Sequence, residues 1–575
     1  MKIKANDYVA EFLRSQGVSH VFEMAGGMIT QLLDAIYKAG DMSIISVHHE
    51  QAAAFAAEAM GRATGNVGVA LATSGPGATN LLTGMASCYF DSSPAIFITG
   101  QVNTHEQKGS KKIRQLGFQE TDIIAMAETI TKKCYKITSA EQIEPFFKDA
   151  YETAISGRPG PVLIDFPMNL QRVELDIAPI QKIYKTKLRL EADSAAFDSL
   201  LLAIKQAKKP LILAGNGINA ARVNNEFLRL VEQLNISVVT SLLGVDTIAF
   251  DHPLRAGFIG SYGNRWANIA IGTCDLLIVL GSRLDIRQTG ADVDSFSQHK
   301  QIFHVDCDTH EINNRLSNCH PFMMDVADFI QHFQALLGDE KLPAKQAWLD
   351  EIAALKEKWP DVNELKDIEG INPNYFMHAL SQASTKAAGF VADVGNHQMW
   401  AAQSLEVAEN QFFMTSGGMG AMGFALPAAI GASLARDKKP VVLIAGDGGF
   451  QLNIQELQTI VRNKLPIKLV VLNNKSLGMI RQFQDNYFEG RYQSTYWGYS
   501  APDFTAIAAA YGINSKTIAM TDDIDSALSA LWEHEGSFLL QVMIDVRANA
   551  YPKIAFGRPI TEMEPFASSI SMEGT

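Results

Sequence analysis

Cysteine is scarce in this chain, and long hydrophobic runs are absent. The five cysteines among 575 residues are scattered, at Cys88, Cys134, Cys274, Cys307 and Cys319. Because no two of them form a CxxC pair, nothing points to a disulfide framework or a structural zinc site. The longest apolar runs, such as LLIVLG, have the length of a strand and are too short to cross a bilayer. We therefore expect no membrane partner.

An excess of positive charge is also lacking. The chain has 49 Lys and Arg against 62 Asp and Glu, a formal net charge of -13, which argues against nucleic acid as a partner. With 47% hydrophobic and 19% charged residues, the composition is that of an ordinary soluble globular protein. The opening stretch MKIKANDYVAEFLRSQG carries Asp7, Glu11 and Arg14 on a helical pattern, so it lacks the apolar core of a signal peptide. We expect a cytoplasmic location.

The length of the chain exceeds one hydrophobic core and predicts roughly three domains. Short apolar runs alternate with helical patterns, first VGVALAT, AIFITG and PVLIDFP, then PLILAG, SVVTSL, DLLIVLG and QIFHVD. This rhythm predicts an α/β fold of three doubly wound parallel-sheet domains, without short repeats or low-complexity tracts. We expect domains at 1–170, 190–335 and 365–550, with a tail at 551–575. The stretch 169–195 is interpreted as a linker, and a polar segment from about Gly338 to Pro373 as a connector that contains a helix.

The most informative stretch runs from Gly446 to Met479. VVLIA before Gly446 predicts a buried strand, Asn453 to Asn463 a helix, and KLVVLN a second buried strand, which together make one βαβ unit. The carboxyl ends of the two strands would bring Asp447 and Asn474 together at the edge where an open α/β sheet binds its ligand. A carboxylate, an amide oxygen and a main-chain carbonyl suit Mg²⁺ and leave room for two phosphate oxygens. We therefore expect a metal set of Asp447, Asn474 and Ser476.

This stretch resembles the thiamine diphosphate signature, in which GDG is followed about two dozen residues later by NN. Here 24 residues lie between Gly448 and Asn473. A GDG turn alone is common in loops, whereas the spacing and the strand, helix, strand context make this match specific. The resemblance implies thiamine diphosphate and Mg²⁺ as cofactors, bound between a pyrimidine-binding first domain and a diphosphate-binding third domain.

A carboxylate is also needed to hydrogen-bond the pyrimidine of that cofactor, and Glu50 is the candidate. It lies in ISVHHEQAAAFAAEAMGRATG, between a β-rich run and an alanine-rich helix, where burial would favour its protonated form. The alternative is a glutamate favoured by the helix dipole. The phrase resembles a segment of the acetohydroxyacid (acetolactate) synthases, whose glutamate has the pyrimidine role. His48 and His49 do not form HExxH and are interpreted as packing or capping residues.

The resemblance to acetohydroxyacid synthases extends along nearly the whole chain. TSGPGATN resembles the turn against the pyrimidine, GFQET the substrate side, DVGNHQMW the diphosphate-binding VGQHQMW with Asn396 in place of Gln, and TSGGMGAMGFALPAAI the segment under the thiazolium. It implies the catalytic residues Glu50, Phe118, Gln119 and Met422. The cofactor-binding residues that it implies are Gly26, Pro76, Asn80, Val394, Gly395, Asn396, His397, Gly420, Met422, Gly446, Asp447, Gly448, Gly449, Asn474, Ser476, Leu477, Gly478 and Met479.

The central domain is expected to be Rossmann-like. PLILAGNGINAA has glycines after a strand, but this pattern alone is weak. GFIGSYG, GSRLDIRQTG and HVDCD resemble the flavin-binding acetohydroxyacid synthases, which implies FAD held by Gly215, Gly217, Gly260, Arg283, Arg287 and Asp306. An ADP-type or empty site is the alternative. A flavin in such carboligases does no net redox work.

Three departures from the family cluster, by resemblance, around the substrate channel. Met168 replaces a Lys, Phe483 replaces a Trp that governs acceptor choice, and Ile286 replaces the second Asp of F-D-D-R. Tyr262 is a further departure in the flavin segment. Loss of the Lys makes the channel less suited to a 2-ketoacid carboxylate and better suited to a bulkier or neutral acceptor.

The resemblance implies a carboligase that decarboxylates pyruvate and transfers the two-carbon unit to a carbonyl acceptor. The acceptor is a second pyruvate, which gives acetolactate, or alternatively another aldehyde or ketone such as a keto-sugar. A flavin-linked 2-ketoacid oxidase and a non-catalytic binding subunit are further alternatives. The expected assembly is a homodimer or homotetramer, with a regulatory subunit as a further partner.

Overall fold

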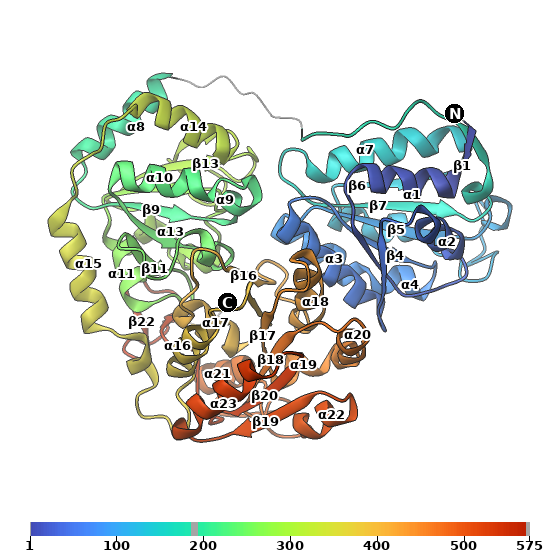
Figure 1. The fold of residues 1–575 in the computed structure, drawn as a ribbon. Helices are drawn as coiled ribbons and strands as arrows, with labels where there is room; N and C mark the ends of the chain where they lie inside the picture. Colours follow the sequence, from blue (N-terminus) through green and yellow to red (C-terminus); the bar gives the residue numbers. More distant parts are fainter. Residues whose placement is uncertain (1, 186–193, 571–575) are drawn as a thin grey trace. The chain divides into compact units, whose positions relative to one another are not determined.

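The structure is a computed structural model that describes residues 2–185 and 194–570. The chain divides into two compact units. Unit 1 comprises Met1–Lys187, Ser416–Leu443 and Gly449–Ile467, and unit 2 comprises Leu188–Thr415, Ile444–Gly448 and Lys468–Thr575. Within the described residues the chain forms three six-stranded sheets (Figure 1). The predicted fold class, three parallel-sheet α/β domains, is confirmed.

The first sheet belongs to unit 1 and has the order β3-β2-β4-β5-β7-β6. Every pairing in it is parallel. Its strands are β2 (His20–Glu23), β3 (Ser43–Ser46), β4 (Gly68–Ala72), β5 (Ala95–Gln101), β6 (Lys133–Lys136) and β7 (Pro161–Pro167). The continuous apolar runs predicted as strands are therefore β4, β5 and β7, which are fully buried because helices cover both faces of a parallel sheet.

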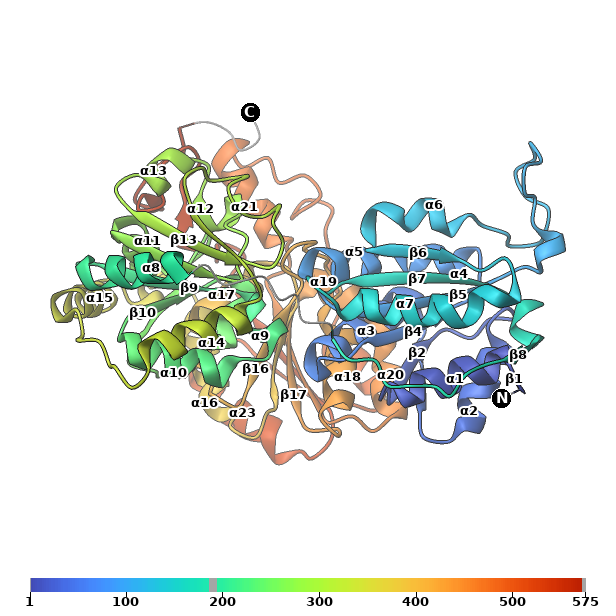
Figure 2. The same cartoon turned by 90° about the horizontal axis from the view of Figure 1, so that it is seen from above.

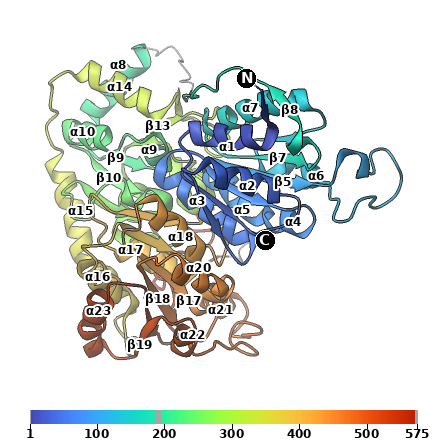
Figure 3. The same ribbon diagram turned by 45° about the vertical axis from the view of Figure 1, so that its right-hand side comes forward.

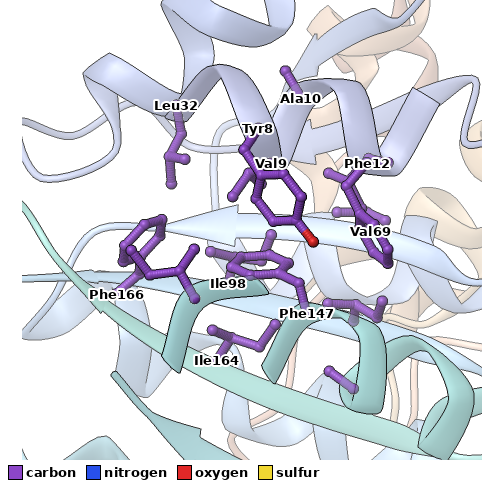
Figure 4. Close-up of a cluster of buried hydrophobic side chains, with 14 of the residues drawn as sticks. Tyr8, Val9, Ala10, Phe12, Leu32, Val69, Ile98, Phe147, Ile164 and Phe166 are labelled. Carbon is purple, nitrogen blue, oxygen red and sulfur yellow. The ribbon is translucent and has the colours of Figure 1, made fainter. Parts of the chain in front are cut away.

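One face of this sheet is covered by α1 (Ala5–Ser15), α2 (Thr30–Ala39) and α7 (Ile143–Ile155). Figure 4 shows the aromatic side chains of Tyr8 and Phe147 between these helices and the strand residues Ile98 and Ile164. The rings of Tyr8 and Phe147 meet edge to face, with centroids 6.4 Å apart. Such pairs add about 0.5–1.5 kcal/mol to the burial of their surface. The helical pattern predicted for the N-terminal stretch is α1.

Small residues allow the helices near the other face to pack closely. These helices are α3 (Glu50–Thr64), α5 (Leu82–Asp91) and α18 (Ala425–Ala435). A Cβ at Gly431 of α18 would lie 2.1 Å from the carbonyl oxygen of Ala56 in α3. The rings of Phe55 and Phe424 meet edge to face beside this contact, with centroids 5.4 Å apart. The contact of α3 with α18 therefore fixes the start of α3, where Glu50 lies, against the segment that carries Met422.

The second sheet lies in unit 2 and is parallel throughout, in the order β11-β10-β9-β12-β13-β14. Its strands are β9 (Pro210–Ala214), β10 (Ser237–Thr240), β11 (Arg255–Phe258), β12 (Leu276–Leu280), β13 (Gln301–Asp306) and β14 (His320–Met323). Two hydrophobic cores lie on its two faces. One contains α8 (Ser194–Gln206), α10 (Asn224–Leu234) and α14 (Val326–Leu337); the other contains α11 (Arg265–Thr273), α13 (Val293–Ser297) and α15 (Gln346–Lys358). Figure 2 shows α10 and α14 on one side of β9 and α11 and α13 on the other.

The third sheet has the order β16-β15-β17-β18-β20-β19. Its strands are β15 (Gly389–Ala392), β16 (Phe412–Thr415), β17 (Val441–Gly446), β18 (Ile467–Asn473), β19 (Asn514–Ile518) and β20 (Phe538–Met543). Helix α16 (Pro373–Ala383) precedes β15, and helices α17 (Asn396–Ser404), α21 (Gly478–Tyr487), α22 (Phe504–Ala510) and α23 (Ile524–Glu533) lie between the strands along the chain. The two strands predicted from VVLIA and KLVVLN are β17 and β18. The helix expected over Asn453–Asn463 is a 3-10 turn, η7 (Ile454–Glu456), followed by α20 (Leu457–Arg462), and a short helix, α19 (Asp447–Gln451), starts at Asp447 itself.

Two segments are more ordered than the sequence predicts. Within the stretch interpreted as a linker, β8 (Glu174–Asp176) pairs antiparallel with β1 (Lys2–Lys4), and residues 186–193 lie outside the described residues. In the C-terminal tail β21 (Lys553–Ile554) pairs with β22 (Met563–Glu564), and the guanidinium of Arg265 donates to the carbonyl of Met563 at 3.2 Å. The connector contains α15, as predicted. No helix in the described parts of the chain is long and apolar enough to cross a membrane.

Candidate active site

In unit 2 the ends of β15, β17 and β18 gather the residues of the GDG and NN motifs. These three strands are neighbours in the sheet. Asp447 follows β17 and is 2% exposed, and Asn474 follows β18 and is 8% exposed. Gly395 and Asn396 follow β15. The carboxyl edge of this sheet therefore carries the predicted cluster, at the position where open α/β sheets bind ligands.

The Asp447 carboxylate is held by neutral donors. The hydroxyl of Tyr499 donates to its Oδ2 at 2.9 Å. Burial raises the pKa of Asp447 to about 6, and the hydrogen bonds from Tyr499 and nearby backbone N–H groups oppose that shift. A dehydrated carboxylate is a hard ligand of the kind that Mg²⁺ prefers, and a bound cation would favour its ionised form. Tyr499 was not predicted from the sequence, because no motif marks it.

Gly478, the first residue of α21, lets this helix approach two asparagines. A Cβ at Gly478 would lie 2.6 Å from Nδ2 of Asn474 and 2.8 Å from Nδ2 of Asn396. Within the described part of the chain, neither α17 nor α21 has a side-chain hydrogen bond at its N-cap, so both helices present backbone N–H groups here. Oδ1 of Asn396 is buried and has no hydrogen-bond partner among the described residues. Two helix N-termini beside polar amides fit a diphosphate.

His397 contacts the backbone at the same carboxyl edge of the third sheet. Its Nε2 accepts a hydrogen bond from the backbone N–H of Gly446 at 3.2 Å. A Cβ on Gly395 or Gly446 would lie 2.7 Å or 2.8 Å, respectively, from the ring. Burial lowers the pKa of His397 to about 3, so the ring is neutral. The two glycines predicted as cofactor-binding therefore also admit a neutral imidazole that ties β15 to β17.

The expected metal set contains a single carboxylate. The backbone N–H of Ser476 donates to Oδ1 of Asn474 at 3.1 Å, and Oγ of Ser476 donates to the carbonyl of Thr495 at 2.9 Å. No group of three or more His, Cys, Asp or Glu suited to a metal occurs among the residues that the structure describes. The predicted Mg²⁺ ligands include only one side chain of these types, the carboxylate of Asp447; the other two ligands are an amide oxygen and a backbone carbonyl. Of the other predicted residues here, Val394 precedes α17, Gly448 and Gly449 lie in α19, Leu477 caps α21 and Met479 is in its first turn.

In unit 1 the predicted pyrimidine-side residues surround the start of α3. Glu50 is 9% exposed, and its Oε2 accepts a hydrogen bond from Nδ2 of Asn80 at 2.9 Å. A Cβ at Gly77 would lie 3.2 Å from Oε1 of Glu50, so this glycine lets the turn pass close to the carboxylate. Pro76 is the first residue of α4 (Pro76–Asn80). His49 caps α3, with its Nδ1 accepting from the N–H of Gln51, which confirms the capping role.

The loop that carries Gly420 and Met422 is held from two sides within unit 1. The carboxylate of Asp91 accepts hydrogen bonds from the N–H groups of Gly417 and Gly418, at 2.9 Å and 2.6 Å. Nδ2 of Asn453 donates to the carbonyl of Gly423 at 2.8 Å.

Asn453 also connects this loop to α3. Its Nδ2 lies 3.3 Å from Oε1 of Gln51, the residue after Glu50. Sequence reasoning missed Asp91 and Asn453, since each acts through a partner far away in the chain. Met422 is half-buried, and Gly420 has φ of +64°, in the left-handed region that favours glycine.

Gln119 lies in this cluster, whereas Phe118 does not. A Cβ at Gly75 would lie 3.0 Å from Cβ of Gln119, and Oγ of Ser74 donates to the Gln119 carbonyl at 2.8 Å. Gly26 lies against Thr73, where a Cβ would come within 2.5 Å. The side chain of Phe118 is 82% exposed. It belongs to the segment between β5 and α6 (Ile123–Ala127), which extends away from the rest of unit 1 (Figure 3).

The glycines of the central sheet bring two loops together at its carboxyl edge. A Cβ at Gly215 would lie 2.2 Å from the carbonyl oxygen of Gly281, and the N–H of Gly217 donates to that oxygen at 3.0 Å. The N–H of Gly217 is therefore already used by the fold. A Cβ at Gly260 would likewise meet the carbonyl oxygen of Arg287 at 2.6 Å.

The charged residues predicted for this edge lie in the neighbouring loops. Nη2 of Arg283 donates to Asp285 at 3.1 Å, and the side chain of Arg287 is exposed. Asp306 ends β13 and is 8% exposed; its Oδ1 accepts from the N–H of Asp308 at 2.8 Å. Ile286, which stands at the position of the missing acidic residue, is 61% exposed.

Comparison with known proteins agrees with this geometry along the chain. Residues 3–126 match the family model of the thiamine pyrophosphate enzyme N-terminal TPP binding domain, residues 197–333 its central domain, and residues 393–542 its C-terminal TPP binding domain.

Relatives from distant organisms align over nearly the full length. The chain is 36% identical over 557 residues to the acetolactate synthase isozyme 2 large subunit of Escherichia coli (strain K12), covering 97% of this chain and 98% of that protein. It is 37% identical over 577 residues to a probable acetolactate synthase large subunit of Methanocaldococcus jannaschii, covering 98% and 95%. It is 34% identical over 567 residues to the chloroplastic acetolactate synthase 2 of Nicotiana tabacum, covering 96% and 84%. The chain therefore belongs to the thiamine pyrophosphate enzyme family, among the relatives of the acetolactate synthase large subunits.

Proposed function

We propose that this enzyme decarboxylates one pyruvate and joins the remaining two-carbon unit to a second pyruvate, which gives acetolactate and CO₂. The observation that carries the proposal is the alignment of 97% of the chain with an acetolactate synthase large subunit at 36% identity. The buried carboxylates of Glu50 and Asp447 support it, because they stand at the pyrimidine and diphosphate positions of the family motifs. The proposed domains are 1–170, 190–335 and 365–550, followed by the tail 551–575.

Thiamine diphosphate, when bound, supplies the electron sink that decarboxylation of a 2-ketoacid requires. Glu50 would hold a proton on Oε1 for the pyrimidine ring, because Asn80 occupies Oε2. Gly420 would offer its carbonyl to the pyrimidine amine, and Met422 would support the thiazolium from below. Gln119 would contact the substrate, whereas the exposed Phe118 would reach a substrate only across the proposed subunit interface.

Mg²⁺ is proposed to bind the carboxylate of Asp447, the amide oxygen of Asn474 and the main-chain carbonyl of Ser476. Asn396 and the N-termini of α17 and α21 would hold the diphosphate. The support is the dehydrated carboxylate of Asp447, the buried Oδ1 of Asn396 and the close approach that Gly478 permits. Tyr499 would have to release or share the Asp447 carboxylate when the metal binds.

FAD is proposed for the carboxyl edge of the central sheet, with Arg283 and Arg287 toward its pyrophosphate and Asp306 toward its adenosine. Because the N–H of Gly217 is used by Gly281, the two arginines would carry most of the phosphate binding. The purified protein should then be yellow, with no need for the flavin to be reduced during turnover. A colourless protein that fails to bind added FAD would favour an ADP-type or empty site.

A homodimer or homotetramer in the cytoplasm is proposed, with a regulatory subunit as a further partner. The exposed apolar side chains of Ile113, Leu116 and Phe118 support a subunit interface, since all three belong to one short stretch of the extended segment of unit 1. Glu50 of one subunit and Asp447 of another would act on the same cofactor. An equal mixture of Glu50→Gln and Asp447→Ala subunits, allowed to exchange, should regain some activity. An active monomer in sedimentation would contradict this arrangement.

A second acceptor class is favoured by Met168 and Phe483. Met168 would bring no charge to a substrate channel. Phe483 packs with Tyr487 and Phe488 at centroid distances of 4.7 Å and 5.7 Å. Transfer to a neutral aldehyde or ketone should therefore compete with transfer to pyruvate.

The experiment incubates the enzyme with ¹³C-pyruvate and a panel of carbonyl acceptors and identifies the products by mass spectrometry. Met168→Lys with Phe483→Trp should shift selectivity toward 2-ketoacids by about 1–3 kcal/mol. If the unmodified enzyme and the double variant both make acetolactate alone, the second acceptor class is rejected and the acetolactate synthase function is retained.

A further inference from the structure

A pocket with a basic lining lies at the amino edge of the central sheet. It has a volume of about 580 Å³ and is lined by the first residues of β10 and β11, by the loop before β11 and by α15. Its cationic lining residues are Arg255, Lys341 and Lys356, with Glu232 as the one acidic group, and His252 also lines it. The glycine loops described above follow the opposite ends of the strands. The pocket is thus separate from the edge proposed for FAD.

Two basic residues that line this pocket, Arg255 and Lys356, are in contact. Arg255 is 4% exposed, and Nζ of Lys356 donates to the Arg255 carbonyl at 2.5 Å. Burial, and then the charge of Arg255, lower the pKa of Lys356 to about 8; burial lowers the pKa of Arg255 to about 10. Adjacent like charges disfavour each other's ionised form. In a chain with a net charge of -13, this local excess of positive charge is not a general property of the surface.

Arg255 also carries an unsatisfied donor. Its Nε is buried and has no hydrogen-bond partner among the described residues. The guanidinium lies over the ring of Phe250, 4.8 Å from its centroid, and Asp361 acts on it through its charge. Neither Phe250 nor Asp361 lines the pocket, so the buried guanidinium adds positive charge behind the pocket wall and is not itself a donor to a ligand there.

We propose that this pocket binds a small molecule that carries a phosphate group. A phosphate brings close to two negative charges and several acceptor oxygens to the ammonium groups of Lys341 and Lys356, which line the pocket beside the buried charge of Arg255. The pocket volume is in the range that holds small metabolites, so the rest of such a ligand has room beside the phosphate. Asn235, Ser237 and Gln346 add hydrogen-bonding side chains to the lining. The inference is independent of the proposed function.

Isothermal titration with inorganic phosphate tests the proposal, using the full chain saturated with thiamine diphosphate and Mg²⁺ at low ionic strength. The variants are Lys356→Met, which keeps the aliphatic stem, and Lys341→Gln, an exposed change that leaves the fold untouched. Lys358→Met is the matched control, because this exposed lysine lies on the same helix but does not line the pocket. Succinate replaces phosphate in a parallel titration, as a dicarboxylate of similar charge.

We expect saturable phosphate binding at one site per chain, with a Kd at least fivefold weaker in Lys356→Met and about two- to threefold weaker in Lys341→Gln. The control should match the unmodified protein, and succinate should bind at least fivefold more weakly. No saturable binding, or equal binding in all four proteins, would overturn the site. Succinate binding as tightly as phosphate would overturn the ligand class.

Discussion

Gly478→Ala tests whether the start of α21 cradles the diphosphate. The added Cβ would lie 2.6 Å from Nδ2 of Asn474 and 2.8 Å from Nδ2 of Asn396. Hydrogen bonds hold both amide groups in place. Nδ2 of Asn396 donates to the carbonyl of Ala548 at 3.1 Å, and Oδ1 of Asn474 accepts from the N–H of Ser476 at 3.1 Å. The substitution therefore forces at least one of these asparagines out of its present position.

The expected cost follows from this overlap. Inserting one carbon into a packed site destabilises it by about 1–3 kcal/mol. The higher helix propensity of alanine offsets at most about 1 kcal/mol of that destabilisation. If the asparagines turn away, the cost falls on cofactor binding, and about 1–3 kcal/mol corresponds to a Kd about 5- to 150-fold weaker. The melting temperature of the cofactor-free protein should change by only a few degrees.

Calorimetric titration with thiamine diphosphate in excess Mg²⁺ measures this Kd. Gly536→Ala is the control, because its Cβ would meet only the movable imidazole of His534, at 3.2 Å. An unchanged Kd in Gly478→Ala, with the fold intact, would refute the assignment of Gly478 and Asn396 to the diphosphate and of Asn474 to its Mg²⁺.

Three further outcomes are expected. Glu50→Gln should lower turnover by more than about 100-fold while cofactor affinity is retained, because the amide cannot protonate the pyrimidine nitrogen; near-normal rates would contradict this role. Asp447→Ala should weaken Mg²⁺ and thiamine diphosphate together in calorimetry, and unchanged affinities would place the metal elsewhere. Because burial lowers the pKa of His397 to about 3, the unfolded chain takes up a proton below pH 6.5 that the fold excludes. The free energy of unfolding should therefore fall by about 2 kcal/mol from pH 6.5 to pH 5 through this group, and His397→Gln should lose that slope in urea titrations; equal slopes would refute it.

The strands and the ends that carry the motifs were predictable from the sequence. Parallel strands buried on both faces are continuous apolar runs, so VVLIA and KLVVLN placed β17 and β18, and with them Asp447 and Asn474. Glu50 was found at the start of a helix because an alanine-rich pattern begins there.

The groups that hold these residues were not predictable. Tyr499 lies 52 residues after Asp447, and Asn453 lies 30 residues after Gly423. Such contacts depend on how distant loops pack, which leaves no periodic pattern in the sequence. The sequence suggested that Gly215 and Gly217 bind a cofactor. The fold gives a second reason for these glycines, because both pack closely against the loop at Gly281.

The stoichiometry of pyruvate consumption tests the central claim most directly. Purified enzyme with pyruvate, thiamine diphosphate and Mg²⁺ should release one CO₂ and form one acetolactate for every two pyruvate molecules consumed, and omission of the cofactor should abolish both products. Absence of cofactor-dependent CO₂ release from pyruvate by the folded, cofactor-saturated protein would contradict the account.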